Sequence, residues 1–350
     1  MNGLDLLDYA IWRPGAPDGV GDLLRGRVEA VVPRLGGLFV ALPVGSGFLP
    51  MHNGMAVLGV GDAVLVTITR GAQGGKGPRL HAVPAGSDLP VTGSPALLQL
   101  GPNPMVRLAA AYPDADILAD DPSFAASLSP QLRARTILTT VAIPPELEGL
   151  IDALAGPDVA LPGGLRASIC PTPALVAIDL DTAAASTGRE SKQAAQFAAN
   201  RAAIAPLLHQ LRLRNLSGPI LIDLAGLASR KRMALRPEVE AALSRDPLQP
   251  RLLGFTSLGL MEILRPRVHA PLHELLTGPH ASALAGLREA ANHARMPPHR
   301  VPDLRAGIGV IASLQQDCIA RESFVRLTGR PISIRMDPSL AYTGWVLDFD

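Results

Sequence analysis

The sequence predicts an α/β protein that begins with a small β-barrel. Over residues 20–83, short apolar runs are separated by closely spaced turns containing Gly and Pro, a pattern typical of barrel strands. From residue 104 onward, strand-like runs alternate with segments of helical periodicity, which indicates an α/β architecture. A chain of 350 residues can form two or three compact domains, so both parts can be accommodated.

Composition changes and periodicity divide the chain further. We expect an amino-terminal segment (1–19), the barrel (20–83), a linker rich in Pro, Gly and Ser (84–103) and an α/β region (104–350) with its functional site within 170–270. Within that region the patterns predict helices over 145–154, 190–215, 237–244, 260–265 and 306–328, and strands over 174–181, 219–224, 251–256 and 331–335. Pro206 falls inside the second of these helices and is expected to kink or shorten it.

Composition excludes several classes of protein. The 32 Lys and Arg residues nearly balance 31 Asp and Glu, so any contact with nucleic acid must come from local patches. Cys170 and Cys318 form no CxxC pair, which argues against a disulfide scaffold or a cysteine zinc site. The first nine residues carry Asp5 and Asp8 and lack the pattern of a secretion signal, and no apolar run of about 18 residues occurs. We therefore expect a cytoplasmic protein without membrane attachment.

Two aspartates occupy matching places in two apolar strands. Asp179 and Asp223 each lie four or five residues into such a strand, and a helix joins the two strands. A strand–helix–strand unit packs with its strands parallel, so both aspartates are expected near the same sheet edge. Asp181, two residues after Asp179, is expected on the same face. The alternative is that these aspartates cap helices or end strands in turns.

Such a group of carboxylates would repel one another unless a cation neutralised them. Hard oxygen ligands suit Mg²⁺, with Mn²⁺ as the alternative. An ion held there can activate a water molecule and neutralise charge on a phosphodiester. Glu262 is a further carboxylate that could reach the ion, although a place on the surface of the expected 260–265 helix explains it better.

A series of short motifs surrounds the two aspartates in order. They are 159–164 (VALPGG), 178–183 (IDLDTA) with Ser186 and Gly188, Phe197 and Asn200 on the next helix, 210–216 (QLRLRNL) with Gly218, and 259–262 (GLME) with Arg265 and Arg267. This series resembles the ribonuclease E/G family. The resemblance implies an OB-type RNA-binding barrel followed by an α/β catalytic region, RNase H-like and deoxyribonuclease-I-like. It also implies that Asp179 and Asp223 bind catalytic Mg²⁺, with Asp181 nearby.

The activity implied by the resemblance is that of an endoribonuclease. It would hydrolyse single-stranded RNA in RNA processing or decay and leave 5′-phosphate and 3′-hydroxyl ends. Two alternatives remain open. One is a catalytically silent RNA-binding protein of the same fold, and the other is a Mg²⁺-dependent nuclease or phosphatase acting on another substrate.

The barrel offers three matching RNA-binding positions. In the family, two phenylalanines and a lysine of the barrel grip single-stranded RNA, and the corresponding residues here are Phe39, Phe48 and Lys76. Aromatic rings can stack on bases and a lysine can bind phosphate. Taken without the resemblance, the two phenylalanines are better explained as core residues. The glycine-rich stretch 71–77 lacks the residues of a phosphate-binding loop and is expected to be a β-hairpin loop.

Two basic clusters flank the expected catalytic strands. They are Arg212 and Arg214, and Arg230 with Lys231 and Arg232. Beside a phosphate such residues guide the RNA backbone, whereas the usual role of such a cluster is a solvated helix surface.

The chain departs from the family pattern in three places. After Arg267 it reads VHAPLH, without the cysteine pair that links subunits through zinc, so no zinc is expected even though His269 and His273 are four residues apart. The stretch between the barrel and the first catalytic strand is short and shows no match to the sensor of 5′ ends. Ala184 and Thr187 replace two arginines of the motif. A homodimer remains an open expectation.

Overall fold

The computed structural model describes residues 5–52, 57–84, 91–182, 189–297 and 300–349. The chain forms two compact units, one of residues 1–10 and 19–272 and the other of residues 11–18 and 273–350. The α/β region expected over 104–350 is therefore divided, because residues after 272 pack around a separate hydrophobic core.

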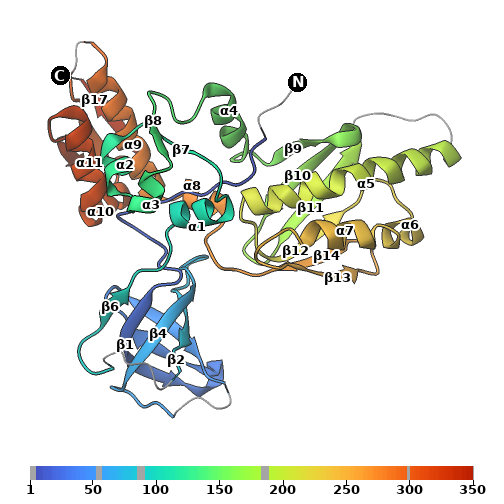
Figure 1. Cartoon of the computed structure of the whole chain (residues 1–350), viewed down its shortest axis with the longest axis horizontal. Helices are drawn as coiled ribbons and strands as arrows, with labels where there is room; N and C mark the ends of the chain where they lie inside the picture. The colour runs from blue at the N-terminus through green and yellow to red at the C-terminus, as the bar shows by residue number, and fades with distance from the viewer. Residues whose placement is uncertain (1–4, 53–56, 85–90, 183–188, 298–299, 350) are drawn as a thin grey trace. The chain divides into compact units, whose positions relative to one another are not determined.

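The amino-terminal barrel has five closed strands and one added strand (Figure 1). The strands are β1 (Leu23–Val32), β2 (Gly37–Ala41), β3 (Ser46–Pro50), β4 (Ala63–Arg70) and β5 (Arg79–Ala82). The barrel closes because β2 pairs with both β1 and β3, while β5 joins β3 to β4. Alternate residues such as Leu38, Val40 and Leu49 fill the interior, as expected for an OB-type barrel.

The segment expected as a linker contains structure. Strand β6 (Ala96–Gln99) pairs antiparallel with β1, so the expectation of a linker over all of 84–103 is wrong for these residues. These residues form a strand because alternate side chains are partly buried against the barrel, although the surrounding sequence has a composition typical of turns. The expected hairpin loop is confirmed, since Gln73 and Lys76 pair across Gly74 and Gly75, both with positive φ.

Short elements follow up to residue 161. They are α1 (Pro104–Ala111), β7 (Ile117–Ala119), α2 (Pro122–Ser127), α3 (Pro130–Arg133), β8 (Thr136–Leu138), α4 (Pro145–Ala153) and β9 (Asp158–Leu161). Each helix begins with a proline, which needs no hydrogen-bond partner at that position. Asn103, Asp121 and Ser129 cap three of them through their side chains. The helix expected over 145–154 is confirmed as α4.

A six-stranded mixed sheet in the order β13-β14-β12-β11-β10-β9 carries the two aspartates. Its remaining strands are β10 (Leu165–Pro171), β11 (Val176–Thr182), β12 (Gly218–Asp223), β13 (Arg251–Phe255) and β14 (Met261–Arg265). Helix α5 (Arg189–Leu213) connects β11 to β12, and these two strands are parallel, as the strand–helix–strand pattern predicts. The other neighbours in the sheet are antiparallel.

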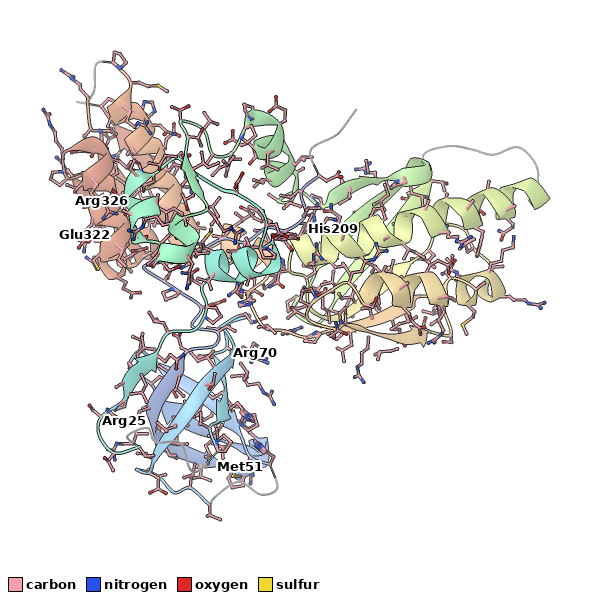
Figure 2. The ribbon with its side chains drawn as sticks, viewed as in Figure 1. Arg25, Met51, Arg70, His209, Glu322 and Arg326 are labelled. Atoms are coloured by element: carbon pink, nitrogen blue, oxygen red, sulfur yellow. The ribbon has the colours of Figure 1, made fainter. Side chains whose placement is uncertain are left out.

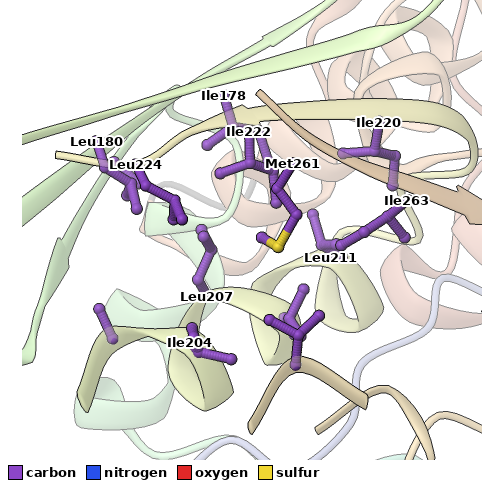
Figure 3. Close-up of a cluster of buried hydrophobic side chains, with 14 of the residues drawn as sticks. Ile178, Leu180, Ile204, Leu207, Leu211, Ile220, Ile222, Leu224, Met261 and Ile263 are labelled. Carbon is purple, nitrogen blue, oxygen red and sulfur yellow. The ribbon is translucent and has the colours of Figure 1, made fainter. Parts of the chain in front are cut away.

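One face of this sheet packs against α5 and α7 (Arg236–Leu243). In Figure 3, Ile178, Ile222 and Met261 point from the strands toward Leu207 and Leu211 of α5. These side chains are almost fully buried. Because side chains alternate along a strand, the residues between them point to the opposite face.

Helix α5 continues through Pro206 to Leu213, so the proline does not shorten it. Ile204 before the proline and Leu207 and Leu208 after it are all buried in the core between the helix and the sheet. This packing maintains the helix where one backbone hydrogen bond is missing. In the described part of the chain, no helix combines the length and apolarity needed to cross a membrane.

The helix expected over 260–265 is instead strand β14. Met261, Ile263 and Arg265 are buried while Glu262 and Leu264 are only partly so, which is the two-residue period of a strand. A five-residue run is too short for periodicity to separate the two structures, and pairing with β12 and β13 decides between them.

In the unit of residues 273–350, the expected long helix over 306–328 is also wrong. The chain forms β15 (Asp303–Ala306), α10 (Ile308–Gln316) and α11 (Cys318–Thr328). Gly307 separates the first two, and Asp317 caps α11 with its side chain. Helices α8 (Leu272–Leu276) and α9 (Pro279–Arg295) and strands β16 (Ile334–Met336) and β17 (Trp345–Asp348) complete the elements after β14.

Candidate metal centre and nucleic-acid interface

Asp179 and Asp223 are direct partners in the register between β11 and β12. Their strand neighbours Ile178 and Ile222 point into the core, so both carboxylates project from the opposite face. Neighbouring strands are about 4.8 Å apart, a spacing that two carboxylates can bridge through one cation. The expected adjacency of the two aspartates is confirmed.

Asp181 projects from the same face one step further along β11. It is opposite Arg166 of β10, whose guanidinium lies 2.5 Å from the carboxylate of Asp158. Partial burial, followed by the charges of Asp181 and Asp223, raises the pKa of Asp179 above its usual value. The aspartates therefore repel one another, and a cation between them would relieve this repulsion.

The donor set fits an ion that needs few protein ligands. Among the described residues, no group of three or more His, Cys, Asp or Glu side chains is arranged to hold a metal ion. Mg²⁺ commonly takes one or two carboxylates and keeps several waters, so the pair Asp179 and Asp223 suffices for it. Glu262 on β14 projects from the same face and pairs with Leu221 on β12. Asp223 lies two residues after Leu221, so Glu262 is a diagonal neighbour of Asp223.

Arg232 contacts Asp223, one member of the aspartate pair, directly. It lies on α6 (Ser229–Met233), and its guanidinium donates to Oδ1 of Asp223 at 3.0 Å. The same side chain donates to the backbone oxygens of Leu227 at 2.7 Å and Gly259 at 2.6 Å. These bonds hold the Arg232 guanidinium in place, and its expected role in guiding an RNA backbone stays a prediction.

The loop that follows Asp223 is held by side chains of α5. Asn200 is fully buried, accepts a hydrogen bond from the amide of Ala225 and donates one to the carbonyl of the same residue. Gln193 donates to the carbonyl of Gly226, whose positive φ suits glycine. Sequence reasoning placed Asn200 in a motif but assigned it no role. Its contact lies 25 positions away in the chain, which local patterns do not show.

Arg214 is a buried structural residue, whereas Arg212 is partly exposed and its role as an RNA contact stays a prediction. Arg214 is buried and donates to backbone oxygens of Ala153 and Gly156, and burial lowers the pKa of its guanidinium. Arg212 forms an ion pair with Asp8 at 3.2 Å. Both arginines follow His209 at the carboxyl end of α5, which leads into the start of β12, whereas Asp223 ends that strand (Figure 2).

The other basic residues of the expected RNA path are more accessible. Arg230 is exposed and Lys231 is half-buried on α6, so their role as RNA contacts stays a prediction. The motif positions Ala184, Ser186, Thr187 and Gly188 lie outside the described residues.

Phe39 and Phe48 face outward from the barrel. They are direct register partners on β2 and β3, and their rings meet edge to face with centroids 5.5 Å apart. Phe39 is 37% exposed, so the explanation of these rings as core residues is not supported. The ring of Phe48 covers Gly37, where any β-carbon would lie 2.3 Å from its tip. Glycine at this position thus allows the ring to lie flat on the strand.

Three residues that sequence reasoning did not single out extend this face. Arg79 on β5 is the register partner of Phe48, and His81 follows two residues later on the same side. The ring of His81 stacks on His52, with centroids 5.7 Å apart. The alternation of polar residues around Leu80 was an available signal, but only strand order brings β5 beside β3. Lys76 is exposed in the preceding loop.

Comparison with known proteins agrees with this arrangement. Residues 123–268 match the model of the ribonuclease E/G family. Ribonuclease E of Synechocystis sp. is 33% identical over 124 residues, which cover 35% of this chain and 18% of that protein. Ribonuclease E of Nostoc sp. is 30% identical over 155 residues, or 42% of this chain and 22% of the relative. Ribonuclease G of Escherichia coli is 33% identical over 119 residues, or 34% and 24%.

The matched region contains both aspartates together with all six strands of the sheet that carries them. The region 123–268 of this chain is thus similar to the ribonuclease E/G family. The alignments span about a quarter or less of the relatives' own length.

Proposed function

We propose that this chain is a metal-dependent endoribonuclease that hydrolyses single-stranded RNA in RNA processing or decay. The observation that carries this proposal is the register pairing of Asp179 with Asp223 on two parallel strands. Similarity of the matched region to the ribonuclease E/G family supports RNA as the substrate. A cytoplasmic location and a homodimer belong to the same proposal.

The catalytic role falls to the aspartate pair. Asp179 and Asp223 would hold Mg²⁺, or Mn²⁺ in its place, and Asp181 would add negative charge beside them. When bound, the ion supplies Lewis acidity toward the scissile phosphate and makes a water molecule easier to deprotonate. Hydrolysis by attack of water on phosphorus, with departure of the 3′ oxygen and transfer of a proton to it, would leave a 5′-phosphate and a 3′-hydroxyl. Asn200 keeps the strand end in place through its bonds to Ala225.

The barrel face would hold the RNA. Phe39 and Phe48 can stack on successive bases, each contributing about 1–3 kcal/mol. Lys76 and Arg79 would bind phosphates of the same strand, and binding would therefore weaken as salt is raised. Arg230 and Lys231 are accessible for further phosphate contacts near Asp223.

Cleavage of a labelled single-stranded RNA rich in A and U tests the proposal. We expect cleavage by the purified chain in Mg²⁺, none in EDTA, and none with Asp223→Asn in Mg²⁺. Asp152→Asn is the matched control, because it removes one exposed carboxylate from α4 and should cleave as the unmodified chain does. End analysis should show 5′-phosphates, and light scattering should report a dimer.

The rival function is RNA binding without catalysis. It is favoured by the arginine that already occupies one oxygen of Asp223. The rival function would be established if the chain binds RNA, loses affinity on Phe48→Ala, and does not cleave the RNA in either Mg²⁺ or Mn²⁺. Cleavage of duplex DNA or of phosphate monoesters in preference to RNA would instead assign another substrate.

A further inference from the structure

One basic side chain forms an ion pair with Asp223 and is itself held by backbone contacts. We propose that Arg232 is a built-in counter-ion of Asp223 that lowers the affinity of this centre for divalent cations. This inference rests on the proposed metal site and adds a positioning residue to it.

The guanidinium of Arg232 cannot easily swing away when another cation arrives. Its two bonds to the carbonyls of Leu227 and Gly259 hold it independently of Asp223. Gly259 has φ of +87°, and a β-carbon there would lie 3.1 Å from the guanidinium, so the backbone packs closely against it. The side chain is 14% exposed, whereas that of Asp223 is 49% exposed. A surface arginine would lack these constraints.

The contact leaves Asp223 able to bind a cation through its other oxygen. Arg232 bonds to Oδ1 of a side chain that is 49% exposed, and Asp179 is the register partner of Asp223 on the neighbouring strand. The fixed guanidinium reduces the charge of the two aspartates from −2 to −1 as seen by an incoming ion. It also contributes to holding the carboxylate in one orientation. The electrostatic repulsion between the guanidinium and a cation acts over a longer range than the benefit of a fixed carboxylate orientation. The net effect of Arg232 is therefore weaker cation binding.

The size of the effect follows from the Coulomb energy. A unit charge several ångströms from a divalent ion, at the high dielectric constant of an exposed site, changes its affinity by roughly five- to thirtyfold. The guanidinium also limits repulsion among the aspartates when no metal is bound. The centre is thereby adapted to exchange its cation rather than to retain it.

Binding of Mn²⁺ alone, followed by electron paramagnetic resonance of the free ion, tests the inference without reference to activity. We expect Arg232→Gln to bind Mn²⁺ five- to thirtyfold more tightly than the unmodified chain. Arg251→Gln makes the same change of charge at an exposed position on β13 and should stay within about twofold. Arg232→Lys keeps the charge and should stay within about threefold.

Each outcome distinguishes the inference from the proposed function. Equal or weaker binding by folded Arg232→Gln overturns the inference, while measurable binding by the unmodified chain still supports the metal site. Absence of Mn²⁺ binding in the unmodified chain and all variants overturns both. If circular dichroism shows that Arg232→Gln does not fold, Arg232→Met supplies the neutral side chain. A change above threefold in Arg232→Lys also contradicts a role based on charge.

Discussion

Asp179 and Asp223 lie directly opposite each other on parallel strands and project from the face of the sheet that α5 and α7 leave uncovered. Burial, followed by the charges of Asp181 and Asp223, raises the pKa of Asp179. The pair is thus electrostatically unfavourable in the absence of a cation, which has a measurable consequence for stability.

Replacing Asp179 by Asn should stabilise the metal-free protein at neutral pH. Because the pKa of Asp179 is raised on folding, the folded state retains its proton to higher pH than the unfolded state does. The stability associated with this group is therefore present at low pH and is lost as pH rises through the raised pKa. In EDTA at pH 7 we expect Asp179→Asn to raise the melting temperature by about 1–3 °C.

The difference should disappear near pH 3, where the carboxyl group is protonated in both states. Thermal unfolding of both proteins across this pH range provides the measurement. A lower melting temperature for Asp179→Asn at pH 7 in EDTA would contradict the repulsion. Adding Mg²⁺ should favour the unmodified protein instead, because only that protein retains both carboxylates.

Asn200→Ala should destabilise the unit that carries the aspartates. The substitution leaves the buried amide and carbonyl of Ala225 without partners, and each lost partner costs about 1–3 kcal/mol. We expect the free energy of unfolding, measured with urea, to fall by about 2–4 kcal/mol. Asn292→Ala on the exposed side of α9 is the control and should change it by less than about 0.5 kcal/mol.

Asn200→Asp should be at least as harmful. A carboxylate can accept from the amide of Ala225 but cannot donate to its carbonyl, and the charge would be buried. Stability unchanged in both variants would show that water replaces the side chain.

Arg265→Met should reveal a second structural arginine of the motif region. The guanidinium is 3% exposed and donates to Asp246 at 2.7 Å and to Asn215 at 2.8 Å. Its removal leaves a buried carboxylate unpaired, so we expect a loss of about 3–5 kcal/mol in urea unfolding. Arg236→Met breaks the exposed pair with Glu240 and should cost less than about 0.5 kcal/mol. Similar losses in the free energy of unfolding for Arg265→Met and Arg236→Met would show that burial of the ion pair does not determine its contribution to stability.

Phe48→Ala should weaken RNA binding without abolishing cleavage at saturating RNA. Loss of one stacking ring lowers affinity by roughly five- to a hundredfold. Fluorescence anisotropy with a short single-stranded RNA provides the measurement. Phe349→Ala, which removes an exposed ring far along the chain from the barrel, is the matched control. Unchanged affinity in a folded Phe48→Ala protein would reduce the barrel to a structural role.

Local patterns were sufficient where a strand or helix is long and regular. The alternation of 20–83 predicted the barrel, and the two apolar strands around a long helix predicted that Asp179 and Asp223 are neighbours. They were insufficient for short runs. Residues 261–265 are compatible with a helix until β12 and β13 pair with them, and Gly307 and Asp317 interrupt a continuous helical pattern.

By itself, the sequence determined the chemistry available at the centre and the two strands that carry it, because the period of the side chains and the handedness of the crossover are local properties. Only the tertiary structure decided which arginines are free. Arg214 is buried, Arg232 is bound to Asp223, and Arg230 is exposed, although all three stand in similar basic clusters. The partners of a long, flexible side chain come from distant segments, here the carbonyls of Ala153 and Gly259, and no local pattern encodes that contact.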